Sequence, residues 1–477
     1  MAHSPAANLL LISFDQWRGD WGDPLQPVVN LPALERLGQQ GLTARRCYTS
    51  SPHCVPARFS WLTGMAPSQL GVTRNVEASL PPDAPSLVRK LRDQGWHTAL
   101  VGKTHWSSHA KTADLRDGLP LLQELGFNTA IEVPGPRGLR RMHCALSDAW
   151  QRAGLLDQQR TDLNSRYGAG RTPAAWAVRP TVLPAELYPD IWIAERGLEL
   201  LAAMPTQQPW LLWVSFVGPH EPFDTPRPWH GKSDAAALPA PTKQPTWIRA
   251  LPEHCELRRT AASWAGLLTA EAIAACRADY ADHLQLLDEQ LAKLLAALAQ
   301  RIDGPQTAVA VCADHGELLG DAGLLYKGAF LEGAIRVPWV YRAPAASNRH
   351  DQQQPQQLNQ PLPLTGLLQQ TLSNLGRGGG ITALMDWAHQ QRSAVVEFGS
   401  ERLILQGKRK LATDQKGWPL WAIHLGRDPL EQCNVITAQP KRWRISPGWR
   451  KLRQEARMEA RRRSAKNWLW RQLGPHG

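Results

Sequence analysis

Short apolar runs alternate with longer amphipathic segments over most of the chain. Five of the apolar runs have the length of a β-strand and end in polar residues, at positions 9–14, 98–101, 210–214, 307–313 and 337–341. Between them, apolar residues recur at helical spacing over residues 87–94, 191–203 and 280–299. Strands that alternate with helices in this way predict an α/β fold, in which helices cover both faces of a central sheet.

The C-terminal region follows a different pattern. Residues 394–398, 403–405 and 410–412 are short strand-like segments with few residues between them, which predicts a small antiparallel sheet. Most residues from Pro447 onward favour helix. We therefore expect an α/β domain over residues 1–380 and a small C-terminal subdomain with a basic helical tail over residues 381–477.

Composition bounds the class of protein. The 477 residues are 43% hydrophobic and 20% charged, which is typical of a globular protein in water. No apolar run approaches the length of a membrane span, and the run at residues 9–14 is too short for a signal sequence. The seven Cys residues are scattered without metal-binding spacing, as expected for reduced thiols. We expect a cytoplasmic protein with no membrane partner.

Most of the formal net charge of +12 belongs to the C-terminal tail. From Lys441 onward, twelve Lys and Arg residues stand against Glu455 and Glu459, with four Trp residues among them. Such a segment suits nucleic acid or another acidic surface, so a binding protein is one interpretation. An amphipathic helix with a solvated cationic face explains the same pattern, and we favour it. We expect the tail to pack on the body or to guide anionic substrates, without a nucleic-acid partner.

Ionisable residues lie at the ends of four of the predicted strands or shortly beyond them. In open α/β sheets, ligands bind beyond the carboxyl ends of the strands, so these residues are expected to meet at one edge of the sheet. The Asp and His side chains among them suit a divalent cation, whereas an isolated Asp after a strand is more often a helix cap. The residues are Asp15, Lys103, His105, His220, Asp314 and His315.

One polar segment, at residues 51–64, contains a thiol. Cys54 is followed by Pro56 and Arg58, and a helix is predicted to begin near Phe59. The start of a helix favours an anion or a nucleophile, and Arg58 is able to hold an oxyanion with two hydrogen bonds. A lone Cys is more often an inert buried side chain, so the residue types alone leave its role open.

Several motifs together resemble those of one enzyme family. The run Cys54-Val-Pro-Ala-Arg58, with Thr63 and Gly64 behind it, is similar to the signature of the type I, formylglycine-dependent sulfatases. The segments VGKTHW, VSFVGPHEPF, CADHGELLGDAGLLYKG and HLGRDPLEQCNV resemble further motifs of that family and occur in its order. The chain has Gln16 where most sulfatases have a second Asp. In this it resembles a subgroup with choline-sulfatase-like and phosphonate-monoester-hydrolase-like members.

The resemblance implies a fold, a cofactor and a set of site residues. The fold is the alkaline-phosphatase-like α/β sandwich of three layers, with a mixed central sheet and a small C-terminal antiparallel sheet. The cofactors are a divalent cation, Ca²⁺ before Mn²⁺ or Mg²⁺, and a formylglycine that a formylglycine-generating enzyme makes from Cys54. The implied metal ligands are Asp15, Gln16, Cys54, Asp314 and His315. The implied catalytic residues are Cys54, Arg58, Lys103, His105, His220 and Lys327.

The implied reaction converts a sulfate ester to an alcohol and inorganic sulfate. Asp314 helps to remove a proton from the hydrated aldehyde, whose oxygen then attacks sulfur. Lys103 and Lys327, with the metal, neutralise charge on the sulfuryl oxygens. His220 protonates the leaving alcohol, and His105 takes the proton that allows sulfate to depart.

Two alternatives to this activity stay open. The same site would serve phosphonate monoesters or phosphate diesters, although the presence of Lys103 and His105 resembles the sulfate-specific members. A degenerate, inactive relative is the second alternative, and the intact set of motif residues argues against it. Asn75 is a weaker candidate for the site, and Ala322 stands where many members have His.

The sequence does not select among carbohydrate, aryl and choline sulfates as the substrate. We expect the wall of the pocket to come from residues 105–185 and 222–265, where no motif is recognisable. Tryptophans in these segments either contact a sugar or a quaternary ammonium, or fill the core as most tryptophans do. They include Trp106, Trp176, Trp229, Trp247 and Trp264.

Overall fold

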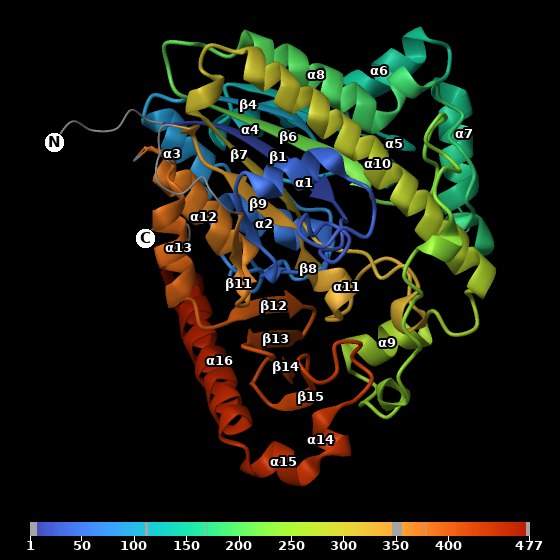
Figure 1. Cartoon of the computed structure of the whole chain (residues 1–477), viewed down its shortest axis with the longest axis vertical. Coiled ribbons are helices and arrows are strands. Elements are labelled where there is room, and N and C mark those ends of the chain that lie inside the picture. Colours follow the sequence, from blue (N-terminus) through green and yellow to red (C-terminus); the bar gives the residue numbers. More distant parts are fainter. Residues whose placement is uncertain (1–6, 110–112, 169, 346–354, 377, 474–477) are drawn as a thin grey trace, which may run out of the picture.

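An eight-stranded mixed sheet lies at the centre of the computed structural model (Figure 1). The structure describes residues 7–109, 113–168, 170–345, 355–376 and 378–473, with residues 464–473 described by their backbone alone. The strand order is β10-β2-β9-β7-β1-β6-β4-β5, and β9 is antiparallel to both of its neighbours. These strands are β1 (Asn8–Asp15), β2 (Leu42–Ala44), β4 (His97–Gly102), β5 (Thr129–Glu132), β6 (Trp210–Pro219), β7 (Thr307–Ala313), β9 (Trp339–Arg342) and β10 (Gln356–Leu358).

Strand β1 occupies the middle of the sheet because its sequence is apolar along nearly its whole length. All eight of its residues are buried, as in a strand that helices cover on both faces. Strands β6 and β7 run parallel to it, with Leu11 opposite Trp213 on one side and Ala310 on the other. The predicted continuous apolar run is therefore the central strand.

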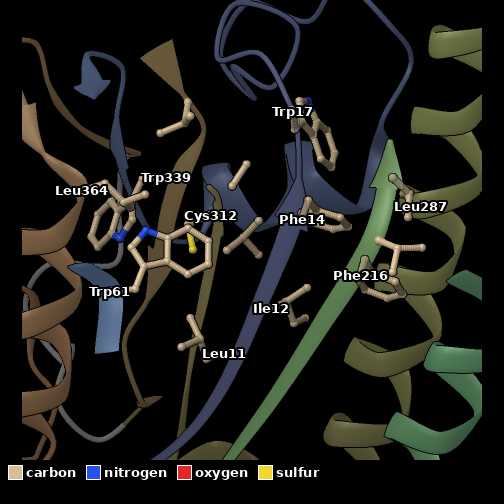
Figure 2. Packing of buried hydrophobic residues seen from close by; sticks show 14 of the residues in the cluster. Leu11, Ile12, Phe14, Trp17, Trp61, Phe216, Leu287, Cys312, Trp339 and Leu364 are labelled. Carbon is tan, nitrogen blue, oxygen red and sulfur yellow. The ribbon is translucent and has the colours of Figure 1, made fainter. Parts of the chain in front are cut away.

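Helices form a layer on each face of this sheet. In Figure 2, Ile12 and Phe14 point toward Leu287 of α10 (Ala270–Gln300), whereas Trp61 and Leu364 lie on the opposite face. Trp61 belongs to α2 (Cys54–Thr63) and Leu364 to α12 (Leu364–Leu375). The structure is thus the predicted three-layer α/β sandwich.

The remaining helices and a second small sheet complete the large part of the chain. The three-stranded sheet has the order β11 (Leu362–Pro363), β3 (Cys47–Tyr48), β8 (Arg336–Val337). The helices are α1 (Pro32–Gln39), α3 (Leu87–Asp93), α4 (Leu119–Glu124), α5 (Pro136–Leu139), α6 (Ala145–Arg152), α7 (Leu156–Tyr167), α8 (Pro189–Ala203), α9 (Glu256–Ala262), α11 (Glu332–Ile335) and α13 (Ile381–Gln390).

The predicted elements match the structure in type, with two corrections. The segment predicted as one strand at residues 337–341 is divided by Pro338 between β8 and β9, which belong to different sheets. Helix α2 begins at Cys54 and not near Phe59, because Pro56 is tolerated in the first turn of a helix. Strands β2, β3, β5, β10 and β11, of two to four residues, were too short to be predicted from the pattern.

A four-stranded antiparallel sheet forms the C-terminal part. Its strands are β12 (Ala394–Phe398), β13 (Glu401–Gln406), β14 (Arg409–Asp414) and β15 (Pro419–His424), of which the last was not predicted. Helices α14 (Val435–Ala438), α15 (Pro440–Ile445) and α16 (Pro447–Leu473) follow, and α16 lies along this sheet (Figure 1).

The start of the basic tail packs on the body through an apolar face. Trp449, Leu452 and Ala456 of α16 are buried in one cluster with Ile404 and Leu411 of the sheet. Most of the arginines and lysines of α16 up to residue 462 are exposed. The side chains of Trp468 and Trp470 lie outside the described part. The predicted amphipathic helix with a cationic outer face is therefore confirmed for the described residues.

The C-terminal sheet also contacts both ends of helix α2. The backbone N–H of Glu397 donates to the carbonyl of Ser50, ahead of the helix, at 2.8 Å. The Glu397 carboxylate accepts hydrogen bonds from the backbone and hydroxyl of Ser68, beyond the helix, at 2.7 and 3.0 Å. Phe398 lies against the ring of His53, with centroids 4.7 Å apart. Strand β12 therefore brackets the segment that carries Cys54.

Two further observations concern membrane spans and thiols. Among the described residues, the helices are all too short or too polar to cross a lipid bilayer. All seven cysteines are free thiols, and six of them are buried.

Replacing Trp449 with Ala should detach the tail from the sheet. We expect Trp449→Ala to lower the free energy of unfolding by about 3–5 kcal/mol, because it removes a large buried side chain. Urea unfolding of the purified variant measures this. Ile445→Ala is the matched control: Ile445 is 70% exposed, and its truncation should change stability by less than about 0.5 kcal/mol. Equal effects of the two substitutions would contradict the packing described above.

Candidate active site

The ends of four neighbouring strands bring ionisable side chains to one edge of the sheet. Asp15 is the last residue of β1, and Asp314 follows β7 directly. Lys103 follows β4, and His220 follows β6. Because β7, β1, β6 and β4 are consecutive in the sheet, these side chains lie at the same edge, and all four are buried. The convergence predicted from the strand pattern is confirmed.

Helix α2 places Cys54 at this edge. Its Sγ lies 3.1 Å from Nε2 of His315, 3.1 Å from Nζ of Lys327 and 3.9 Å from Oδ1 of Asp15. Burial by itself raises the pKa of the thiol, but the charges of Lys103, Lys327 and His315 lower the pKa of Cys54 well below its ordinary value. The surroundings of residue 54 therefore favour negative charge.

Four side chains offer ligand atoms for a metal ion at the same point. One atom from each of Asp15, Cys54, Asp314 and His315 lies within 4.8 Å of the others. All four residues are buried, and the set consists of two carboxylates, an imidazole and a thiol. Such a set fits a divalent cation. They are four of the five residues that the family resemblance implied as metal ligands, the fifth being Gln16.

Gln16, the residue after Asp15, offers a further donor atom, its side-chain oxygen. Its backbone N–H donates to Oδ1 of Asp314 at 3.0 Å, and its Nε2 donates to Glu221 at 2.9 Å and to Glu317. Its Oε1 is buried and has no hydrogen-bond partner among the described residues. An unpaired buried oxygen is costly, and a bound cation would satisfy it.

Arg58 joins the two carboxylates. It lies one helical turn after Cys54, is 1% exposed, and donates from Nε to Asp314 at 2.7 Å and from Nη2 to Asp15 at 3.1 Å. Its Nη1 donates to the Lys103 carbonyl at 2.5 Å and to the Ser215 hydroxyl at 3.0 Å. The guanidinium is thus engaged by protein groups, and it orients the carboxylates instead of facing the cavity.

Positive neighbours keep Asp15 ionised. Burial raises the pKa of this carboxyl group, and the charges of Lys103, His220 and Arg58 outweigh that effect and hold the pKa well below its usual range. The ammonium of Lys103 lies 2.5 Å from Oδ2 of Asp15. Lys327 stands on the other side of the thiol, 3.2 Å from Nε2 of His315.

His105 is held as a neutral imidazole. Burial and the charges of Lys103 and His109 lower the pKa of His105 well below its ordinary value. Its Nδ1 has no hydrogen-bond partner in the described part of the chain. A neutral ring is able to accept a proton at the pH of most cells.

His220 is positioned through its neighbour Glu221. Nδ1 of His220 lies 2.7 Å from the carbonyl oxygen and 3.2 Å from the carboxylate of Glu221. Burial raises the pKa of Glu221, but His220, Arg137 and Lys327 lower it to about 2, so this carboxylate is ionised. Glu221 therefore holds the imidazole of His220 from its Nδ1 side.

Asp190 fixes the backbone just before His220. Its Oδ1 accepts hydrogen bonds from the N–H groups of Val217 and Gly218, both at 2.9 Å, and its Oδ2 lies 2.9 Å from Nε2 of His283. Asp190 belongs to α8 and to no recognisable motif, so it was not predicted.

Of the two weaker candidates from the sequence, Asn75 and Ala322, one lies at the site and the other does not line the cavity. Asn75 is brought to the site: its Oδ1 accepts the N–H of Val55 at 3.0 Å, and its Nδ2 lies 4.0 Å from Sγ of Cys54. Ala322 does not line the cavity above Cys54. Glu221 and Glu317 were missed, although both stand inside motifs that were recognised, next to His220 and two residues after His315.

A cavity of about 390 Å³ opens above Cys54. Lys103, His105 and His220 also line it, and its outer walls come from residues 75–78 and from residues between 135 and 142. The predicted contribution of residues 105–185 is therefore found in part. The predicted contribution of residues 222–265 is wrong for this cavity, because none of its lining residues lies in that segment.

The tryptophans singled out from the sequence do not line this cavity. Those of them that are buried fill the core, namely Trp106, Trp176, Trp247 and Trp264, with exposed fractions between 1% and 8%. Trp229 is partly buried and packs against the same core. No aromatic ring of Phe, Tyr or Trp is present among the described residues that line the cavity.

Solved structures of other proteins have a similar fold. The phosphonate monoester hydrolase of Agrobacterium radiobacter superposes with a TM-score of 0.73 at 22% identity, over 95% of this chain and 96% of that one. A 2-O GAG sulfatase gives a TM-score of 0.66 at 18% identity, over 96% and 93% of the two chains. At these identities the likeness establishes the fold alone, which is the alkaline-phosphatase-like α/β sandwich.

Sequence comparison identifies the family. The family model named Sulfatase matches residues 7–366. A choline-sulfatase of Rhizobium meliloti is 27% identical over 71% of this chain and 62% of its own length. An arylsulfatase of Clostridium perfringens is 24% identical over 71% and 68%. A multifunctional alkaline phosphatase superfamily protein of Trinickia caryophylli is 29% identical over 72% and 69%. The chain belongs to the sulfatase family and to its enzyme class, the sulfuric ester hydrolases.

Removing Arg58 should leave two buried carboxylates without their shared partner. We expect Arg58→Leu to lower the free energy of unfolding by about 3–5 kcal/mol, because uncompensated buried charges are strongly destabilising. Arg58→Lys should have a smaller effect, since it keeps the charge and loses the fork of N–H groups. Thermal and urea unfolding measure both. Arg36→Leu, at an exposed site on α1, is the control and should change stability only slightly. An equally small loss of stability in Arg58→Leu would refute the role of Arg58 as the shared partner of the two carboxylates.

Proposed function

We propose that this protein hydrolyses a sulfate monoester to an alcohol and inorganic sulfate, with residue 54 as the nucleophile after its conversion from Cys to formylglycine. The observation that carries the proposal is the position of Cys54. Its Sγ lies at the floor of the cavity, in contact with His315 and Lys327 and beside the charged pair Asp15 and Lys103. An anion that entered the cavity would meet positive charge on two sides of residue 54.

The proposed metal ligands are Asp15, residue 54, Asp314 and His315, with Oε1 of Gln16 as a fifth donor. Replacement of the sulfur at residue 54 by oxygen would make the set oxygen-dominated, which suits Ca²⁺, and Mn²⁺ or Mg²⁺ next. When bound, the cation supplies charge that stabilises the sulfuryl oxygens. Both oxygens of Asp314 already accept N–H groups, from Gln16, His315 and Arg58. We therefore assign Asp314 to metal binding and not to proton removal.

A formylglycine at residue 54 would be held by the residues around Cys54 and, as its hydrate, would supply two hydroxyl groups, one for attack on sulfur and one for the release of sulfate. Lys103 and Lys327 flank residue 54 and neutralise charge on the transferring group. Lys103 reaches the site along Gly135, where a Cβ atom would lie 2.8 Å from its Nζ. A side chain at position 135 would therefore displace this ammonium.

Proton transfers are assigned to the two histidines that line the cavity. His220, which Glu221 holds in position, donates to the oxygen of the leaving alcohol. His105, neutral because of its burial and of the cations around it, accepts the proton that accompanies release of sulfate. We propose positioning roles for Arg58 and Asp190.

Hydrolysis of phosphonate monoesters is the second candidate. Gln16, in place of a second Asp, and the similarity in fold to a phosphonate monoester hydrolase favour it. Lys103 and His105, both at the cavity, support sulfate esters as the preferred substrates.

We also propose that a formylglycine-generating enzyme matures the chain. We further propose that the chain divides into two domains near residue 380. The cytoplasmic location stays a prediction.

Parallel assays separate the two activities. Protein co-expressed with a formylglycine-generating enzyme should cleave an aryl sulfate faster than the phosphonate ester of the same phenol. In Cys54→Ala, kcat/KM for the sulfate ester should fall by about 10³-fold or more, because the covalent route is removed. Peptide mass spectrometry of residue 54 reports whether the thiol has become an aldehyde. Faster phosphonate turnover would select the second candidate, and sulfate cleavage by protein with an unmodified thiol would refute the proposed nucleophile.

Metal removal tests the proposed ligands. Treatment with EDTA should lower the Tm and abolish hydrolysis, and Ca²⁺ should restore both. The physical reason is that an ion bound only to the native state stabilises it, by about 2.7 kcal/mol at 100 times Kd. In Asp314→Asn the response of the Tm to Ca²⁺ should disappear, whereas Asp117→Asn, at an exposed position, should keep it. A Tm that is insensitive to EDTA in the mature wild-type protein would argue against a bound cation.

A further inference from the structure

The outer wall of the active-site cavity carries a cluster of three arginines. Arg137, Arg140 and Arg141 line it together with Lys103, whereas Glu77 is the one carboxylate among the described lining residues. The catalytic groups need only the sulfuryl end of a substrate. The arginines surround the part of the cavity that the remainder of a substrate would occupy.

The three arginines differ in how their charge is balanced. Arg137 forms an ion pair with Glu221 at 2.8 Å. Arg140 donates from Nε to the neutral amide oxygen of Asn164 at 2.9 Å. Arg141 forms no ion pair or side-chain hydrogen bond with any residue that the structure describes, and its side chain is exposed. Two guanidinium groups at the cavity therefore lack a counter-charge.

The positive charges of Arg137 and Arg141 act on Arg140. Burial, and then the charges of Arg141 and Arg137, lower the pKa of Arg140 below its ordinary value. Like charges that are kept close without an anion between them are unfavourable, and an anion placed beside them removes that cost. Guanidinium groups bind carboxylate and sulfate with paired, charge-assisted hydrogen bonds.

The segment that carries the cluster is fixed in place. Leu139 and Met142 on either side of the pair are buried, and backbone hydrogen bonds from Arg141 and Met142 to Gly138 close the turn at 3.0 and 2.9 Å. Arg160 donates to the carbonyl of Met142 at 2.9 Å. Arg140 is half-buried, with its guanidinium 6.0 Å from the centroid of the Tyr167 ring, and Arg141 is exposed. Two buried anchors around these arginines make a preorganised arrangement and not a flexible loop.

We propose that Arg140 and Arg141 form a second anion subsite, so that the preferred substrate is a sulfate ester that carries another negatively charged group, a carboxylate or a second sulfate. The inference rests on the proposed sulfatase function and narrows its substrate class. Cationic esters such as choline sulfate are disfavoured, because the described cavity lining lacks the Phe, Tyr and Trp rings that hold quaternary ammonium groups.

The test uses aryl sulfates that share one leaving phenol. They differ at a methylene-linked meta substituent, which is a carboxylate, a carboxamide or a trimethylammonium group, and the methylene keeps the acidity of the phenol nearly constant. For the mature wild-type enzyme, kcat/KM should be about 10-fold or more higher for the carboxylate than for the carboxamide, the scale of a charge-assisted hydrogen bond. The trimethylammonium ester should be the poorest substrate. An ester in which a second sulfate replaces the carboxylate shows which of the two anions is preferred.

Substitution of the arginines should remove the selectivity. In the double variant Arg140→Gln with Arg141→Gln, the ratio of kcat/KM for carboxylate over carboxamide should fall to about 1, because both unpaired cations are gone. Arg152→Gln, at an exposed position on α6 outside the cavity, is the matched control and should keep the wild-type ratio. A wild-type ratio near 1, an unchanged ratio in the double variant or a preference for the ammonium ester would overturn the subsite.

Turnover of the carboxamide ester reports the proposed function independently of the subsite. If no sulfate ester is cleaved, the proposed function fails, and binding then tests the subsite. Calorimetric titration of Cys54→Ala with the carboxylate and carboxamide esters should show tighter binding of the carboxylate. That difference should vanish when Arg140 and Arg141 are both Gln. Equal affinity of the two esters for Cys54→Ala would refute the subsite whatever the reaction.

Discussion

The buried guanidinium of Arg58 is the interaction on which the rest of the site depends. It binds Asp314 and Asp15, at the ends of two adjacent strands, and it belongs to the helix that carries Cys54. One side chain therefore sets the spacing between both carboxylates and fixes the helix against the sheet. Buried ions contribute little net stability as pairs, but the loss of one partner is severe. A change at Arg58 would therefore disturb both the geometry of the site and the stability of the fold.

Different parts of the fold supply different functions. The edge of the sheet provides the groups that we assign to metal binding and proton transfer, because four parallel strands end there. Helix α2 adds Cys54, the nucleophile of the proposed reaction, from a separate segment. The turn after α5, which holds Arg140 and Arg141, contacts neither the carboxylates nor Arg58 in any interaction described here. In the proposed reaction, recognition of the substrate is thus separated from the chemistry, and changes in that turn would alter specificity with little effect on the reacting groups.

The sequence predicted much of this arrangement, for a physical reason. Long apolar runs such as the one before Asp15 have only one place in an α/β sheet, its middle, and this fixes where the residues after them lie. Short strands such as β3 depend on neighbours distant in sequence, so local pattern does not reveal them. Arg140 and Arg141 were not predicted for the same reason: only the packing of Leu139 and Met142 turns them toward the cavity.

The contacts of β12 with Ser50 and Ser68 tie the helix that carries Cys54 to a part of the chain that a ribosome makes much later than the helix itself. During translation, the residues around Cys54 emerge long before the strand that fastens them. In the finished fold the thiol is only 1% exposed, so a modifying enzyme would find it reachable mainly in the growing chain. Modification of Cys54 would then have to precede completion of the fold. Slower synthesis or folding of β12 would leave more time for the modification to occur.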